Sequence, residues 1–200
     1  MLFIGVTTGH SSIMSLFPRW AEALGLEATI EGRDVPIGAE AEAYRRAVGE
    51  VARHEGVTGA LVTTHKVAVY RHARDLFCDV DRWADVCGEV SCISKGEEGL
   101  VGYAKDPITA WKALEEQVGP GYWREHPQAE VLCLGAGGSG TALTARLLTD
   151  HHLPARVVVT NRSREPLDHL RQVHQRVGVR TTVEYRRVAS PNDTDRLLDG

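Results

Sequence analysis

The chain has 200 residues, a formal net charge of −4 and 42% hydrophobic residues, a composition typical of a globular protein with one or two domains. The mild acidity excludes the basic surface that nucleic acids or anionic membranes require. No apolar run is long enough to span a membrane, and the apolar start is too short for a signal peptide. The four cysteines form no CxxC pair, which fits reduced thiols in a cytoplasmic protein.

Strand-like and helix-like segments alternate along the chain, which predicts an α/β fold with parallel sheets and crossover helices. The first part has predicted strands at 2–8, 27–35 and 58–64, and predicted helices at 12–26, 39–55 and 66–77. A hairpin is predicted over 90–104, with "KGEEG" as its turn. The helix that follows, 106–118, begins with Asp106 as a candidate N-cap and Pro107 in its first turn.

A Gly/Pro-rich stretch at 119–128 interrupts this alternation, which then restarts. The later elements are predicted strands at 131–134, 156–160 and 181–186, and predicted helices at 138–149 and 165–177. The interruption predicts one domain over 1–118 and a second over 119–200. An earlier junction, within the helix that begins at residue 106, stays open.

A glycine-rich turn follows the first strand of the second domain. "VLCLGAGGSG" places Gly135, Gly137 and Gly140 in a G-x-G-x-x-G pattern between a strand and a helix. The first glycine permits a tight turn, the second lets a pyrophosphate approach, and the third lets the helix pack on the strand. The pattern predicts a dinucleotide site formed by Gly135, Gly137, Gly138, Ser139 and Gly140. A plain glycine-rich turn is the alternative.

The end of the next strand indicates which dinucleotide is bound. An NAD site usually has an acidic residue there, but this chain has Asn161, Arg162, Ser163 and Arg164. Two guanidinium groups and a hydroxyl suit a ribose 2′-phosphate, which a carboxylate would repel. NADP is therefore favoured over NAD as the cofactor. A solvated loop with two surface arginines is the alternative.

Taken in order, the motifs resemble those of the shikimate dehydrogenase and quinate dehydrogenase family. The family pattern G-x-P-I-x-H-S-x-S-P is partly matched by "GVTTGHSSIM", and N-V-T-x-P-x-K falls on "ALVTTHK". I-G-A-V-N-T-I falls on "CGEVSCI", G-x-N-T-D on "GYAKD", and the GAGGxxRA and N-R-T patterns on "GAGGSG" and "NRS". The resemblance implies an N-terminal α/β substrate-binding domain followed by an NADP-binding Rossmann domain.

The resemblance also implies a catalytic pair of Lys66 and Asp106 in an NADP-dependent alcohol dehydrogenase. Oxidation of a secondary alcohol requires the hydroxyl proton to leave, and reduction of the ketone requires a proton donor to the nascent alkoxide. A lysine ammonium can donate that proton and stabilise the charge, while an aspartate orients it. Without the resemblance, the sequence would predict a surface lysine at Lys66 and a helix N-cap at Asp106.

Departures from the family patterns fall on the residues that hold the family's substrate. The second serine of the first motif is replaced by Ile13, and polar positions of the other motifs carry Ala60, Val62, Ser91 and Ala104. A changed polar shell usually changes the substrate. We therefore expect a related cyclitol, polyol or hydroxy acid in place of shikimate. Its expected hydrogen-bonding partners are Ser11, Thr63, Thr64 and Ser91, with His10 and His65 flanking the cleft in either a binding or a structural role.

Two further expectations concern the whole protein. The predicted elements end after half a Rossmann domain, so either the chain is shortened or the protein lacks the half that covers the nicotinamide. The second case favours a non-catalytic sensor derived from the family. A homodimer is plausible for this architecture, and no metal site is expected, because adjacent side chains such as His151 and His152 point in different directions.

Overall fold

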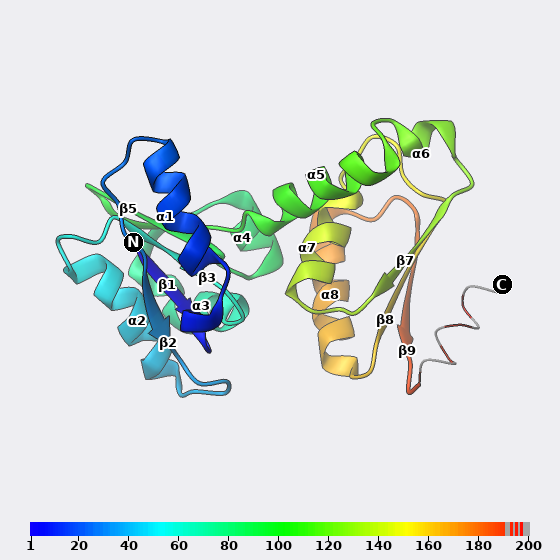
Figure 1. Ribbon diagram of the computed structural model, residues 1–200. Helices are drawn as coiled ribbons and strands as arrows, with labels where there is room; N and C mark the ends of the chain where they lie inside the picture. Colours follow the sequence, from blue (N-terminus) through cyan, green and yellow to red (C-terminus); the bar gives the residue numbers. More distant parts are fainter. Residues whose placement is uncertain (191–192, 194, 196, 198–200) are drawn as a thin grey trace. The chain divides into compact units, whose positions relative to one another are not determined.

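A computed structural model describes residues 1–190, 193, 195 and 197, and the chain divides into two compact units, Met1–Lys105 and Asp106–Gly200 (Figure 1). The predicted α/β class is confirmed in both units. The units meet in sequence just before helix α5 (Asp106–Val118), and the predicted domain bounds at 118/119 stay a prediction. The assignment of substrate binding to one unit and cofactor binding to the other remains a prediction.

The first unit is built on a sheet that has six strands within the described residues, in the order β2-β1-β3-β5-β6-β4. The strands are β1 (Leu2–Gly5), β2 (Glu31–Asp34), β3 (Gly59–Val62), β4 (Phe77–Val80), β5 (Cys92–Gly96) and β6 (Gly99–Tyr103). Strand β1 is parallel to β2 and β3, whereas β5 is antiparallel to both β3 and β6. The expected parallel sheet is therefore mixed here, because two strands joined by a tight hairpin must run in opposite directions.

Four α-helices of this unit lie within the described residues, and α2 has the largest number of buried side chains. They are α1 (Ile13–Ala23), α2 (Ala41–Arg53), α3 (Lys66–Ala73) and α4 (Arg82–Cys87), with short 3-10 turns at Thr8–His10 and Arg74–Leu76. Helix α2 buries Tyr44, Ala47, Val48 and Val51, which is the i, i+3, i+4, i+7 spacing of one helix face. These side chains pack in one core with the fully buried strand β1.

Strand β4 and helix α4 were not predicted from the sequence. Helix α3 ends at Ala73, and the chain then forms β4 instead of continuing as a helix to residue 77. The Asp81 carboxylate begins α4 by accepting a hydrogen bond from the Ala84 N–H at 2.7 Å, and Gly88 ends it in the left-handed conformation. Both elements are too short to display a clear periodicity.

The second unit has a parallel sheet in the order β7-β8-β9 within the described residues. Its strands are β7 (Glu130–Leu134), β8 (Arg156–Asn161) and β9 (Thr182–Arg187), and its helices are α5, α6 (Tyr122–Glu125), α7 (Gly138–Leu147) and α8 (Arg164–Val177). Figure 1 shows α7 and α8 side by side on one face of this sheet, as right-handed crossovers require. The predicted Rossmann-type βαβαβ order is confirmed, and α6 lies within the predicted 119–128 loop.

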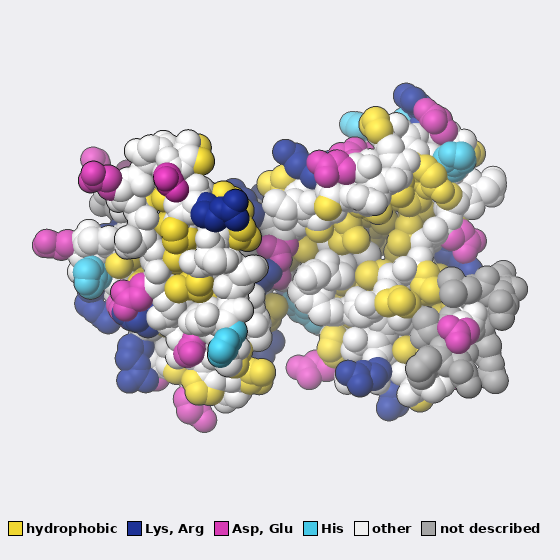
Figure 2. All heavy atoms as spheres, in the orientation of Figure 1, with side chains coloured by type: hydrophobic (Ala, Val, Ile, Leu, Met, Phe, Trp, Pro, Cys, Tyr) yellow, Lys and Arg dark blue, Asp and Glu magenta, His cyan; other side chains and the backbone are white. Residues whose placement is uncertain are grey.

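The surface of both units mixes charges of either sign. On the face shown in Figure 2, basic and acidic side chains are interspersed. Within the described part of the chain, none of the helices combines the length and the apolar character that crossing a bilayer would need.

Candidate active site

A hollow of about 240 Å³ lies in the first unit, where β1 and β3 end. In parallel sheets, ligands bind beyond the carboxyl ends of the strands. The hollow brings together three of the predicted substrate-binding residues, Ser11, Thr63 and Thr64. Its complete lining is Phe3, Val6, Thr7, Thr8, His10, Ser11, Thr63 and Thr64. Five of these eight residues carry a side-chain hydroxyl.

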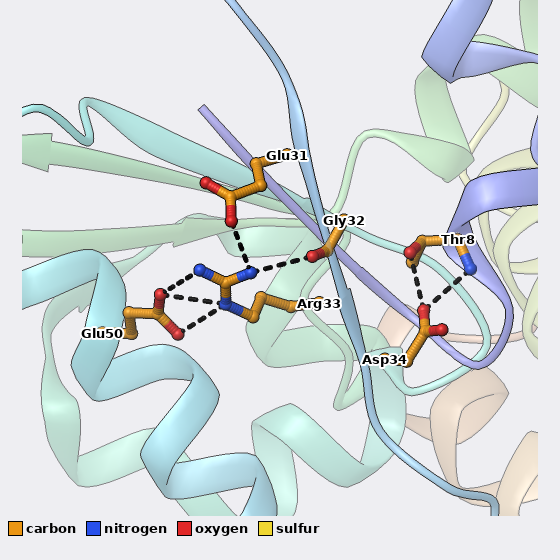
Figure 3. Close-up of polar contacts among 6 residues, drawn as sticks. All are labelled: Thr8, Glu31, Gly32, Arg33, Asp34 and Glu50. Carbon is orange, nitrogen blue, oxygen red and sulfur yellow. Dashed lines mark hydrogen bonds and ion pairs between the residues drawn. The ribbon is translucent and has the colours of Figure 1, made fainter.

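A hydrogen-bonded pair, Thr8 and Asp34, supports one wall of the hollow (Figure 3). The Asp34 carboxylate accepts from the Thr8 N–H at 2.8 Å and from the Thr8 hydroxyl at 2.6 Å. These two bonds lower the pKa of the Asp34 carboxyl, because they stabilise its charged form. Thr8 is 5% exposed and fits only because residue 32 is glycine: a Cβ there would lie 2.1 Å from the Thr8 hydroxyl oxygen. The sequence did not indicate this pair, although Asp34 lies within the predicted strand 27–35 and ends the observed β2.

Strand β2, which carries Asp34, is anchored to helix α2 by an ion pair (Figure 3). The Arg33 guanidinium donates from Nε to both carboxylate oxygens of Glu50, at 2.9 and 2.8 Å, and from Nη1 to Glu31 at 2.8 Å. Arg33 lowers the pKa of the Glu50 carboxyl in return. Strand β2, at the edge of the sheet, is thus held beside the hollow by the ion pairs of Arg33 with Glu31 and Glu50.

The turn from β3 to α3 forms another wall, and its backbone is strained. Thr64 has a φ of +55°, which is an outlier for a β-branched residue. The His65 N–H donates to the Thr63 carbonyl across this residue, while the Thr63 N–H donates to the Ile4 carbonyl at 2.9 Å. Such conformations cost roughly 1–3 kcal/mol and cluster at functional sites. The strain presents Thr64 to the hollow.

His65 has a structural position directly before Lys66. Its ring is 4% exposed, its Nε2–H donates to the Val35 carbonyl at 2.7 Å, and its edge lies against Tyr44. Of the two roles left open for this histidine, the contacts give it the structural one. Lys66 then begins α3 and is partly buried, and its carbonyl accepts from the Val90 N–H at 3.0 Å. Lys66 therefore follows the hydroxyl-bearing turn without lining the hollow itself.

Ser91 and Asp106 are not among the residues that line this hollow. Ser91 is 5% exposed, and its hydroxyl accepts from the Lys105 N–H at 2.9 Å and donates to the Tyr103 carbonyl at 3.3 Å. Asp106 begins α5 in the second unit, and its carbonyl accepts from the Thr109 hydroxyl at 3.4 Å. Substrate binding by Ser91 and the pairing of Lys66 with Asp106 stay predictions.

The glycine loop of the second unit has the geometry that its spacing predicts. Gly135 has a φ of +110°, and its N–H donates to the Thr160 carbonyl at 2.9 Å. A Cβ at Gly140 would lie 2.2 Å from the Gly135 carbonyl oxygen, so only glycine lets the helix approach the turn this closely. A Cβ at Gly137 would meet nothing within 4 Å, so the space over this residue is open.

Helix α7 begins in this loop, with Gly137 as its N-cap and with Gly138 and Ser139 as its first residues. The first N–H groups of a helix have no partner within the helix, and the helix dipole favours an anion beside them. The open space over Gly137 and these N–H groups fit a dinucleotide pyrophosphate. Binding of the cofactor by the glycine loop remains a prediction.

The loop after β8 contacts the glycine loop through one side chain. The side-chain Oδ1 of Asn161 accepts from the Ala136 N–H at 3.4 Å, and its side-chain Nδ2 donates to the Ser163 carbonyl at 3.0 Å. Ser163 is the N-cap residue of α8, and Arg162 and Arg164 on either side of it are exposed. The structure thus brings the two groups of predicted cofactor residues together through Asn161.

A buried hydrogen-bond chain supports α7 from beneath. The Thr144 hydroxyl donates to the Gly140 carbonyl at 2.7 Å, so it accepts from His174 Nε2–H at 2.9 Å. His174 Nδ1 is then the acceptor for the Tyr185 hydroxyl, also at 2.9 Å. Burial lowers the pKa of His174 from its usual 6.5 to about 4, which keeps the ring neutral. No sequence pattern indicated these hydrogen bonds, because the residues that form them lie in three separate elements.

Comparison with known proteins links these two units to one group of enzymes. A shikimate dehydrogenase (NADP(+)) of Bacillus licheniformis is 30% identical over 158 residues, covering 78% of this chain and 53% of the relative. A shikimate dehydrogenase (NADP(+)) of Thermococcus kodakarensis is 31% identical over 163 residues, covering 81% of this chain and 53% of the relative. The chain thus spans about half the length of the curated relatives it matches.

The solved structures give the same result for the fold. A quinate dehydrogenase of Corynebacterium glutamicum in complex with NAD superposes with a TM-score of 0.74 at 21% identity, over 96% of this chain and 65% of that one. No protein-family model matches the chain. The matched residues of this chain are therefore similar to curated shikimate dehydrogenases, and the superposed structure has the same fold.

Proposed function

We propose that the protein is an NADP-dependent oxidoreductase of the shikimate dehydrogenase type. It transfers a hydride between NADP(H) and a secondary alcohol or ketone of a cyclitol or hydroxy acid. The observation that carries the proposal is the hydroxyl-lined hollow of the first unit, which is followed directly in sequence by Lys66 at the start of α3. The identity to relatives named shikimate dehydrogenase (NADP(+)) supports the same reaction.

In the proposed reaction, Lys66 handles the proton. Its ammonium donates a proton from Nζ to the oxygen of the ketone during reduction and stabilises the negative charge that develops there. The Asp106 carboxylate orients the ammonium and balances its charge. When NADP(H) is bound, it supplies or accepts the hydride at the carbinol carbon. Acid–base assistance of this kind contributes about 10²–10⁴ in rate.

The lining of the hollow supports a substrate with several hydroxyl groups. Ser11, Thr63 and Thr64 offer hydroxyls that both donate and accept, and the eight lining residues include no lysine or arginine. A site of this chemistry discriminates by the number and position of hydroxyl groups more than by charge. We therefore favour a cyclitol or polyol over shikimate itself.

The residues of the second unit support NADP as the cofactor. The loop after β8 carries Arg162 and Arg164, and no carboxylate occurs between Asn161 and Arg164. A 2′-phosphate gains charge-assisted hydrogen bonds from guanidinium groups, whereas NAD gains none. The curated relatives are named as NADP(+) enzymes.

The test is the nicotinamide absorbance change with NADP⁺ or NAD⁺, measured on the longest natural form of the protein with shikimate, quinate and related cyclitols. Lys66→Met should lower turnover about 10²–10⁴-fold, whereas the matched control Lys112→Met, at an exposed position of α5, should leave it unchanged. Binding of cofactor and cyclitol without turnover in the unmodified protein would refute the enzyme and favour a sensor. Light scattering on the same sample tests the predicted homodimer.

A further inference from the structure

A second hollow, of about 420 Å³, lies between helix α8 and the end of strand β9. Its lining is Arg164, Leu167, Asp168, Arg171, Tyr185, Arg186 and Arg187. Four arginines therefore line one space in the second unit, at the carboxyl end of β9. This is the side of a parallel sheet on which ligands bind.

Two of the four arginines already have carboxylate partners. Arg171 pairs with Asp168 at 3.0 Å and lies over the Tyr185 ring, 4.7 Å from its centroid. Arg186 pairs with Glu184 on its own strand. The side chains of Arg164 and Arg187 form no ion pair with any residue that the structure describes. The hollow thus carries uncompensated positive charge at these two positions.

Arg187 also contacts the predicted ribose loop. It is the register partner of Asn161 across the parallel strands β8 and β9, and its Nε–H donates to the Arg162 carbonyl at 3.2 Å. The Val188 N–H donates to the Asn161 carbonyl at 3.1 Å in the same place. One guanidinium N–H therefore fixes the loop, and the N–H groups on Nη1 and Nη2 have no hydrogen-bond partner among the residues that the structure describes.

We propose that Arg187, together with Arg164, holds the ribose 2′-phosphate of NADP and makes the protein select NADP over NAD. The inference rests on the proposed function, because it assumes that a dinucleotide binds along the glycine loop. The residue was not indicated by the sequence, since it lies on a different strand from the Asn161–Arg164 loop. A planar guanidinium held at Nε presents its two terminal nitrogens to a phosphate in the bidentate geometry.

The test is isothermal titration of the protein with NADP⁺ and with NAD⁺, which needs no turnover. Arg187→Leu should raise the Kd for NADP⁺ about 10–100-fold, as expected for the loss of charge-assisted bonds, and should change the Kd for NAD⁺ less than about 2-fold. Arg186→Leu is the matched control, because it lines the same hollow but is already paired with Glu184. It should change both constants less than about 3-fold.

Arg187→Lys keeps the positive charge but loses the planar, bidentate guanidinium. Its Kd for NADP⁺ should lie between those of the unmodified protein and Arg187→Leu. If Arg187→Leu weakened the binding of NADP⁺ and of NAD⁺ equally, the inference would be overturned, because Arg187 would then only shape the loop. An unchanged Kd for NADP⁺ would overturn it as well. If the unmodified protein binds neither dinucleotide, the proposed function itself fails, and this result is distinguishable from the other two.

Discussion

Each unit supports its candidate binding loop with a buried histidine, but the two histidines act differently. In the first unit, His65 donates directly to the Val35 carbonyl and holds the Thr63–Thr64 turn against the end of β2. In the second, His174 reaches the Gly140 carbonyl only through the Thr144 hydroxyl, and it also accepts from Tyr185. The first arrangement needs one donor, whereas the second needs a neutral ring with one donor and one acceptor.

Because of this difference, the two units should be sensitive to different substitutions and conditions. The loop of the second unit depends on a protonation state and on the absence of side chains in its glycine turn. The turn of the first unit depends on a strained backbone at Thr64. A change of pH or an added methyl group should therefore disturb the second unit most, and a change of backbone preference should act on the first.

The largest expected effect is that of Gly140→Ala, which would destroy the glycine turn. The new Cβ would lie 2.2 Å from the Gly135 carbonyl oxygen, and backbone atoms cannot yield to it as a flexible side chain would. We expect the second unit to lose about 3 kcal/mol or more of unfolding free energy, together with dinucleotide binding. Urea denaturation followed by tryptophan fluorescence measures the first quantity, since Trp123 is buried in this unit.

Gly137→Ala is the matched control for that substitution. A Cβ at this position meets nothing within 4 Å, and its φ of −77° suits alanine. The unfolding free energy should stay within about 0.5 kcal/mol of the original, while NADP⁺ should bind more weakly because the methyl group blocks its approach. Undiminished binding by Gly137→Ala would contradict the proposed pyrophosphate site.

The next effect concerns acid and His174. Its pKa is about 4 in the folded protein against a usual 6.5, so well above pH 6.5 the ring is neutral in both states and has no influence. As the pH falls below 6.5, the unfolded chain takes up a proton that the folded protein does not, and stability declines until about pH 4. The loss amounts to about 3 kcal/mol, measured by urea denaturation at a series of pH values.

His174→Gln should remove this part of the acid dependence, while it costs about 1–3 kcal/mol at neutral pH through the lost hydrogen bonds. His151→Gln, at an exposed position of the same unit, should leave the pH profile unchanged. If both variants keep the original slope between pH 6.5 and 4, then His174 is not the group responsible.

The smallest effect is expected at Thr64 in the first unit. Asparagine adopts a positive φ more readily than a β-branched residue, so Thr64→Asn should raise the unfolding free energy by about 0.5–1 kcal/mol. Thr64→Val keeps the β-branch and loses the hydroxyl, so it should show no such gain. A loss of stability in Thr64→Asn would mean that contacts of the threonine outweigh the strain of its backbone.

The sequence predicted the regular parts of the fold well and the supports of the candidate site poorly. Long periodic helices such as α2 and α8, and the glycine turn at Gly135–Gly140, follow from local spacing. Strand β4 and helix α4 were missed because they are short. The antiparallel pairing of β3 with β5 depends on tertiary contacts, which the local sequence pattern does not reveal.

The same distinction applies to the site residues. Ser11, Thr63 and Thr64 were predicted from motif positions, and they line one hollow. Ser91 was predicted in the same way, yet its hydroxyl is bonded to the Lys105 N–H. Asp34, His174 and Arg187 were not predicted, because each acts on a partner from another element. Arg187 of β9, for example, contacts the loop that follows the neighbouring strand β8. Sequence spacing identifies groups along one turn but not those that meet across a sheet.

The close fit of Thr8 over Gly32 has a consequence for how this sequence can diverge. Any side chain at position 32 would occupy the space of the Thr8 hydroxyl, and any loss of that hydroxyl would leave Asp34 with one bond fewer. Neither position is therefore free to drift alone. Among descendants of this chain, a substitution at 32 should appear only together with a smaller residue at 8, and such a double change would mark a lineage whose hollow has been reshaped.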